Sequence, residues 1–122
     1  MVAWNASREA TRAIKDALPL LQMAKEVVVL AINPGHGIHG HGDVPGADIC
    51  THLSRHGVHA EAAQTVVADA NVGQTLLAEM SDRACDLLVM GAYSHSRVRE
   101  LALGGVTRYV FERMTTPVFM SH

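Results

Sequence analysis

Hydrophobic and polar positions along this chain fall into two alternating patterns, helical spacing and short unbroken apolar runs. After Ser7, apolar residues recur every three or four positions, and Pro19 is expected to bend or end the resulting helix. Val27–Ile32 is an uninterrupted apolar run rich in β-branched residues, which is typical of a strand buried on both faces. The same patterns predict helices over about 47–56, 71–84 and 96–114, the last broken at Gly104 and Gly105, and strands over about 2–4, 58–67, 86–90 and 117–120.

This alternation of strands and helices predicts an α/β fold of a single domain, residues 1–122. The sheet is expected to be open, parallel, five-stranded and doubly wound, with helices on both faces, as in Rossmann-like folds. Its first strand is expected to be short, because Met1 stands directly before it. We therefore expect a domain trimmed at its N-terminus, or the second half of a tandem protein.

Composition and charge narrow the function. The chain is 48% hydrophobic, which suits one compact core, and its net charge of -2 argues against general nucleic-acid binding. No apolar run approaches the roughly 18 residues of a membrane span, and two cysteines do not make a disulfide framework. A cytoplasmic location without membrane attachment follows as the expectation. Residues 91–122 carry four arginines against two glutamates, which suits a small anionic ligand or simply a solvated surface.

The segment 90–107 carries the most chemistry. Its sequence is MGAYSHSRVRELALGGVT, which predicts a buried strand, a glycine, a hydroxyl-rich turn, a short helix, and two glycines that open another helix. Because a helix N-terminus offers unpaired N–H donors and a partial positive charge, a phosphate group is the ligand that this segment favours. A purely structural turn would have the same local pattern, so the residues alone leave both interpretations open.

This segment resembles the nucleotide-binding signature of the universal stress protein family: Gly, two residues, Gly, nine residues, Gly, then Ser or Thr. Gly91, Ser94 and Gly104 align with the three glycine positions, and Gly105 aligns with the hydroxyl position, so Ser94 and Gly105 depart from the pattern. The resemblance extends over the chain through VAWNAS, PGADI, DLLVMGAYSHSR and TPVFMSH. Asn5 occupies the place of an acidic residue that helps to hold the nucleotide in ATP-binding members.

The resemblance implies an adenine-nucleotide-binding protein, with ATP or AMP as ligand and Mg²⁺ as an accompanying ion, in stress response or signalling and without fast catalysis. The adenine is expected near Ala3 and Ile32, with Met90 and Gly91 nearby and Asn5 as a wall of the cleft. Phosphates are expected at the N–H groups of the predicted helix start and at neighbouring hydroxyl and basic side chains: Gly104, Gly105, Val106, Ser94, Ser96, Thr107, His95 and Arg97. The resemblance also implies a homodimer that pairs through the last strand, with Val118, Phe119 and Met120.

Two other functions stay open at this stage. One is a dimerisation or interaction module of the same family that holds no nucleotide. The other is metal handling by a histidine-rich loop with His36, His39 and His41. The helical pair His52 and His56 could bind the same metal, with His59 or a loop histidine completing the set.

Several side chains have both a structural and a functional interpretation. Trp4 is expected either to wall the cleft or to pack in the core. Cys50 and Cys85 are expected in helical stretches as small core residues. Four methionines are expected to fill the core: Met80, Met90, Met114 and Met120.

Overall fold

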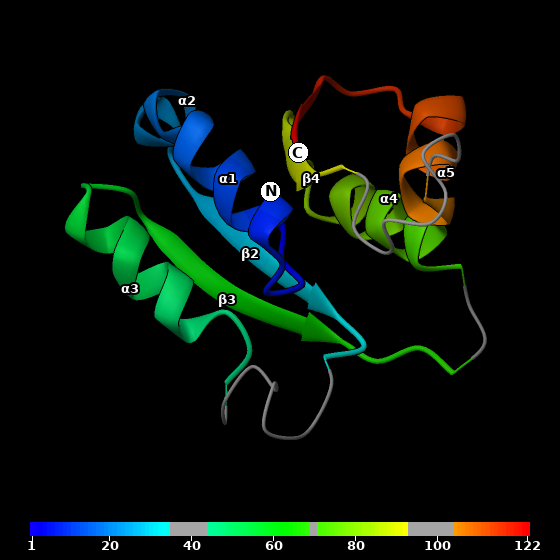
Figure 1. The fold of residues 1–122 in the computed structure, drawn as a ribbon, viewed down its shortest axis with the longest axis horizontal. Coiled ribbons are helices and arrows are strands. Elements are labelled where there is room, and N and C mark those ends of the chain that lie inside the picture. The colour runs from blue at the N-terminus through cyan, green and yellow to red at the C-terminus, as the bar shows by residue number, and fades with distance from the viewer. Residues whose placement is uncertain (35–43, 69–70, 93–103) are drawn as a thin grey trace.

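The computed structural model describes residues 1–34, 44–68, 71–92 and 104–122, and these segments form one parallel five-stranded sheet with helices on both faces (Figure 1). The strands lie in the order β3-β2-β1-β4-β5, and every neighbouring pair is parallel. In chain order the elements are β1 Val2–Ala3, α1 Arg8–Asp16, α2 Leu18–Met23, β2 Val27–Ile32, α3 Ala47–Arg55, β3 Ala60–Thr65, α4 Val72–Asp82, β4 Leu88–Gly91, α5 Gly105–Arg113 and β5 Val118–Ser121. The predicted open, doubly wound α/β fold is confirmed.

The first helix begins and ends where the sequence indicates. The Ser7 side chain accepts a hydrogen bond from the Ala10 N–H at 3.1 Å, as a helix N-cap does. Helix α1 ends at Asp16, and Pro19 lies in the first turn of the separate helix α2, where its missing N–H costs no hydrogen bond. The predicted break at Pro19 is therefore confirmed.

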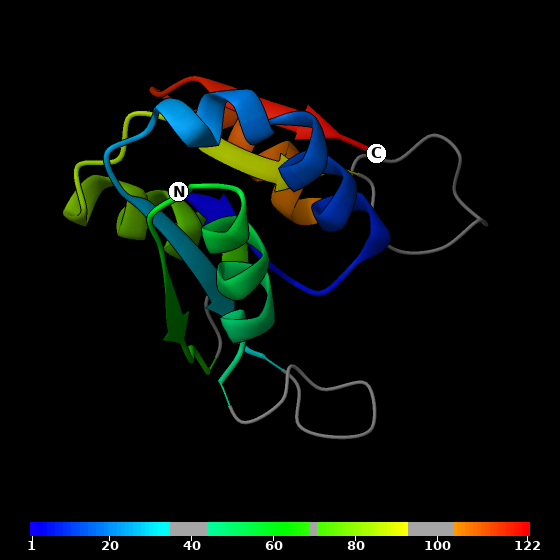
Figure 2. The same cartoon turned by 90° about the vertical axis from the view of Figure 1, so that its left-hand side faces the viewer.

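Two layers of apolar side chains, one on each face of the sheet, form the core. On one face, α1 packs over β4 and β5 and α3 over β3 (Figure 2), and Ile14 and Leu53 are buried against Val29 of β2. On the other face, α4 and α5 bury Leu76 and Val110 against the neighbouring residue Leu30. Because side chains of a strand alternate between faces, Val29 and Leu30 pack in opposite core layers. This explains why β2 is apolar at every position.

Strand β1 is central and short, as predicted. Val2 is paired with Val29 on one side and with Val89 on the other, and Ala3 is paired with Leu30. Trp4 continues the pairing beyond the assigned strand, because its N–H donates to the Leu30 carbonyl at 2.8 Å. The backbone that leaves β1 is thus held at the carboxyl edge of the sheet.

Two of the expectations for these structural side chains, the helical position of Cys85 and the burial of Met114, are wrong. Helix α4 ends at Asp82, so Cys85 follows the helix instead of lying within it, and Ala84 is exposed in a left-handed conformation with φ 50°. Met114 follows α5 and is 40% exposed, so it does not fill the core. The structure agrees with the expectation for Met80 and Met90, which are buried.

None of the helices in the described segments is both long enough and apolar enough to cross a membrane.

Candidate functional site

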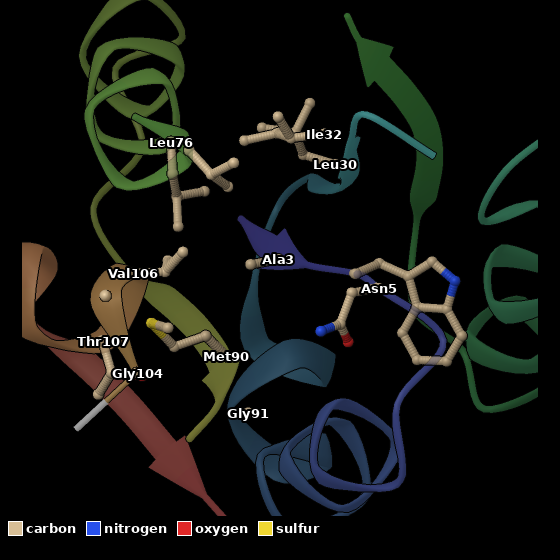
Figure 3. A pocket seen from close by; sticks show the side chains of 13 residues that line it. Ala3, Asn5, Leu30, Ile32, Leu76, Met90, Gly91, Gly104, Val106 and Thr107 are labelled. Atoms are coloured by element: carbon tan, nitrogen blue, oxygen red, sulfur yellow. The ribbon is translucent and has the colours of Figure 1, made fainter. Parts of the chain in front are cut away.

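A cleft opens at the carboxyl ends of β1, β2 and β4, where the strand order reverses (Figure 3). Its volume is about 270 Å³, close to the lower end of small-molecule pockets at about 300 Å³. It lies where open α/β sheets bind their ligands. The residues that line it come from four regions of the chain: Ala3, Trp4, Asn5, Leu30, Ile32, Val72, Leu76, Met90, Gly91, Gly104, Gly105, Val106 and Thr107.

The inner part of the cleft is apolar. Leu30 and Ile32 of β2, Leu76 of α4 and Met90 of β4 direct their side chains into the same space (Figure 3). Leu30, Leu76 and Met90 are each no more than 5% exposed, so this wall is a continuation of the core layer beneath α4 and α5. Such a surface suits a flat, uncharged ring system.

The outer part of the cleft is the N-terminus of helix α5. Gly104 is the N-cap and supplies no capping side chain, and the first intrahelical bond runs from the Arg108 N–H to the Gly104 carbonyl at 3.0 Å. The N–H groups of the first turn therefore have no acceptor within the helix. A Cβ atom built on Gly104 or Gly105 meets no atom of the described residues within 4 Å, so on that side both glycines border open space. Unpaired N–H donors beside open space favour an anion.

Thr107 adds a hydroxyl group to this helix end. The residue is only 4% exposed and lines the cleft, yet among the described residues its hydroxyl has no hydrogen-bond partner. Leaving a buried hydroxyl unpaired costs about 1–3 kcal/mol. A ligand oxygen in the cleft would satisfy it.

Asn5 stands at the mouth of the cleft in a tight turn. Its Oδ1 accepts the Ser7 N–H at 3.1 Å, and the intervening Ala6 has φ 55°, a conformation that costs an alanine about 1–2 kcal/mol. The side chain is exposed. Asn5 therefore helps to shape the turn that leads into α1, besides lining the cleft.

Gly91 is a glycine for a reason that local sequence does not reveal. A Cβ at this position would lie 2.6 Å from the Ala10 nitrogen and 2.7 Å from the Glu9 carbonyl carbon. Helix α1 thus crosses β4 too closely for any side chain at Gly91. The glycine is required by packing between helix and strand, and only its backbone borders the cleft.

Trp4 serves the core on the opposite face. Its ring packs with the layer beneath α1 and α3, and its Cδ1 lies 3.8 Å from the position of a Cβ on Gly46. Because side chains alternate between faces, the Trp4 ring lies on the face opposite Ala3, although Trp4 also lines the cleft. Its placement therefore agrees with both expected roles, packing in the core and forming part of the cleft wall.

All predicted cleft residues that fall in the described segments come together in the cleft: Ala3, Asn5, Ile32, Met90, Gly91, Gly104, Gly105, Val106 and Thr107. The other predicted residues, Ser94, His95, Ser96 and Arg97, lie outside the described residues. Sequence reasoning missed Leu30, Val72 and Leu76. Their helical or strand periodicity marks them as apolar, but whether another element covers them depends on tertiary packing.

The described part of the proposed metal site is small. His52 and His56 lie together on α3, with ring centroids 4.5 Å apart, and the His56 Nδ1–H donates to the His52 carbonyl at 2.8 Å. His36, His39 and His41 lie outside the described residues. Within the described segments, no group of three or more histidine, cysteine, aspartate or glutamate side chains is placed to hold a metal ion.

These features define an open α/β domain of the class that binds ligands at the carboxyl edge of a parallel sheet. The sequence matches the model of the Universal stress protein family over residues 1–122, and the chain belongs to that family. It is 40% identical over 45 residues to Universal stress protein Slr1230 from Synechocystis sp. (strain ATCC 27184 / PCC 6803 / Kazusa). That stretch is 37% of this chain and 16% of the relative, so the match spans a small part of the relative's length.

Solved structures show the same fold. The universal stress protein from Archaeoglobus fulgidus matches with a TM-score of 0.76 at 19% identity, over 98% of this chain and 95% of that one. Universal stress protein UspA from Lactobacillus plantarum matches with a TM-score of 0.74 at 16% identity, over 99% of this chain and 94% of that one. At these identities the likeness concerns the fold alone.

Proposed function

We propose that this universal stress protein binds an adenine nucleotide, ATP or AMP, in its cleft and serves in stress response or signalling. The observation that carries the proposal is the combination of a helix N-terminus without a side-chain cap and the buried hydroxyl of Thr107, which has no hydrogen-bond partner among the described residues. Both groups border the same cleft as an apolar wall. A nucleotide presents a flat ring to such a wall and an anion to such a helix end.

In this arrangement the base lies against Leu30, Ile32 and Leu76, and the phosphate meets the first turn of α5. Helix N–H groups and the Thr107 hydroxyl supply the hydrogen bonds. The described lining residues present no carboxylate, so Mg²⁺ accompanying ATP would be bound by phosphate oxygens. The described lining offers N–H and hydroxyl donors beside an apolar wall, and binding without fast turnover is the function proposed for it.

The proposal includes a homodimer and a cytoplasmic location. Strand β5 is at the edge of the sheet, and its half-buried Val118, Phe119 and Met120 are apolar, so a second copy of β5 would cover them. Cys50 and Cys85 are both free thiols, in keeping with a reducing compartment.

Isothermal calorimetry with AMP, ATP and adenosine, with and without Mg²⁺, tests the ligand. We expect AMP and ATP to bind, and Thr107→Val to weaken AMP binding about tenfold, the effect of one lost hydrogen bond. Adenosine affinity should change little in this variant, because adenosine lacks the phosphate. If none of the three ligands binds the wild-type protein at millimolar concentration, the interaction-module function replaces the nucleotide-binding one.

A further inference from the structure

Helices α4 and α5, which carry two sides of the cleft, touch at a glycine. A Cβ atom built on Gly73 of α4 would lie 2.9 Å from the Cβ of Tyr109 on α5, 3.0 Å from its Cδ1 and 3.1 Å from its Cγ. Real Cβ atoms essentially never approach other atoms that closely. The two helices are therefore as near to each other as they are because position 73 has no side chain.

Tyr109 cannot relieve such a contact by rotating its ring. The nearest atom is its own Cβ, which is fixed to the backbone of α5. The ring itself is held from another direction, because the Arg113 guanidinium lies 4.3 Å from the ring centroid and is paired with Glu112 at 3.0 Å. Any side chain at position 73 must therefore move one helix away from the other.

The contact between Gly73 and Tyr109 lies within one helical turn of cleft-lining residues on both helices. On α4, Gly73 lies between Val72 and Leu76, which both line the cleft. On α5, Tyr109 follows Val106 by three residues, or about one helical turn. Leu76 of α4 and Val106 of α5 both border the cleft (Figure 3). The distance between α4 and α5 thus sets the distance between the apolar wall and the helix end that faces the phosphate.

We propose that Gly73 is a positioning residue for the cleft: its contact with Tyr109 fixes the width of the site and so determines how well a nucleotide reaches both the apolar wall and the N-terminus of α5. This inference rests on the proposed nucleotide-binding function. It assigns to Gly73 and Tyr109 a role in recognition, although neither residue borders the cleft.

The test compares AMP and adenosine affinities in Gly73→Ala by calorimetry. Displacing the first turn of α5 weakens its contact with phosphate, so we expect AMP affinity to fall about tenfold while adenosine affinity changes less than about threefold. Adding Tyr109→Gly removes all three close atoms. The double variant should recover most of the AMP affinity although its thermal stability is lower still, because the added glycine and lost ring weaken α5.

A matched control separates positioning from general destabilisation. Ala13 is fully buried in the core layer on the opposite face, so Ala13→Val overpacks the protein away from the cleft. It should lower the melting temperature without changing the ratio of AMP to adenosine affinity. Equal loss of both ligands in Gly73→Ala, or no recovery in the double variant, would overturn the inference. Failure of the wild-type protein to bind AMP would instead overturn the proposed function on which it rests.

Discussion

Single residues determine where the helices of this protein begin and end. The C-terminal ends of helices α3 and α4 have the same geometry but differ in the residue that adopts the left-handed conformation. Gly57, two residues after helix α3, has φ 77°, and Ala84, two residues after helix α4, has φ 50°. In both, crossed hydrogen bonds return to the last turn: Val58 N–H to the Leu53 carbonyl at 3.1 Å, and Cys85 N–H to the Met80 carbonyl at 2.8 Å. Only the first of these ends has the glycine that this geometry favours.

Exchanging glycine and alanine at these two positions should have opposite effects. Ala84→Gly should raise the free energy of unfolding by about 1 kcal/mol, because it removes the left-handed strain of an alanine. Gly57→Ala should lower it by about the same amount, and through backbone strain alone, since a Cβ there meets nothing within 4 Å. Urea denaturation of the two variants and the wild type measures both. A change of the same sign in both variants would contradict this account.

The sequence predicts the end of α3 but not the end of α4, and the reason is physical. Gly57 marks its helix end because glycine is the usual residue there, and Asn71 marks the start of α4, where its Oδ1 accepts the Gly73 N–H at 2.9 Å. Ala84 carries no such signal, since alanine is the best helix former. The predicted helix therefore extended too far, and Cys85 was placed inside it.

At the scale of elements, a hydrogen-bonded carboxylate joins α4 to the end of β3. Glu79 accepts the Thr65 hydroxyl at 2.8 Å and the Arg83 Nε–H at 3.0 Å. The hydrogen bonds from Arg83 and then from Thr65 lower the pKa of Glu79 below its usual value. A carboxylate whose pKa is lowered by folding stabilises the protein above its unfolded pKa, near 4.3, and loses this effect as the pH falls through the folded pKa.

Glu79→Gln should therefore lower the free energy of unfolding at pH 7 by about 1 kcal/mol or less. The difference from the wild type should shrink as the pH falls below about 4, where the wild-type carboxylate becomes protonated. Glu112→Gln is the control, because Glu112 also pairs with an arginine four residues away, Arg108, in the reverse order, but is exposed and makes no bond to a strand residue among the described ones. Chemical denaturation between pH 3 and 7 measures both variants. If the difference in free energy of unfolding between the wild type and Glu79→Gln stays constant between pH 3 and 7, a stabilising role of the charged Glu79 hydrogen bonds is contradicted.

How elements cross is the part of the fold that the sequence could not supply. Val27–Ile32 predicted a strand buried on both faces because every residue is apolar, and β2 serves both core layers. Helix α1 crosses Gly91 so closely that a Cβ there would lie 2.6 Å from the Ala10 nitrogen, and α4 passes α5 closely at Gly73; both crossings depend on elements far apart in the sequence. A single sequence shows the glycines and leaves the reason for them open.

At the scale of the whole molecule, the sheet ends in an open edge at β5. Leu88 N–H donates to the Pro117 carbonyl at 3.0 Å and Ala92 N–H to the Ser121 carbonyl at 2.9 Å, so odd-numbered residues of β5 direct their backbone groups toward β4. The alternation of a strand then turns the backbone groups of Val118 and Met120 toward the open edge. These groups are the ones that a second copy would pair with.

Met120→Pro should therefore disrupt the proposed dimer, because it removes an N–H that faces the open edge and not one that faces β4. Analytical ultracentrifugation of the wild type should give the mass of a dimer, and the variant should give that of a monomer. Circular dichroism of the variant should retain its helical signal as evidence of folding. A wild type that sediments as a monomer would contradict this assembly.

The cleft could be predicted in outline because strand order alone places it at the carboxyl edge. Its described predicted residues, from Ala3 to Thr107, meet there. The apolar wall of Val72 and Leu76 could not be predicted, because burial of a helix face does not say which of its turns remains uncovered. The central claim is that this cleft, with the open end of α5, binds a nucleotide.

Gly104→Val tests that claim most directly. Gly104 has φ -54° and ψ 147°, which valine adopts readily, and a Cβ there meets no atom of the described residues within 4 Å, so the variant should fold with a melting temperature only slightly lowered by its poorer N-cap residue. Its side chain would occupy the space at the helix N-terminus where phosphate is expected. Ala78→Val, on the exposed face of α4, adds the same bulk away from the cleft. Calorimetric titration with AMP should show binding to the wild type and Ala78→Val and none to Gly104→Val; equal binding by all three would contradict the account.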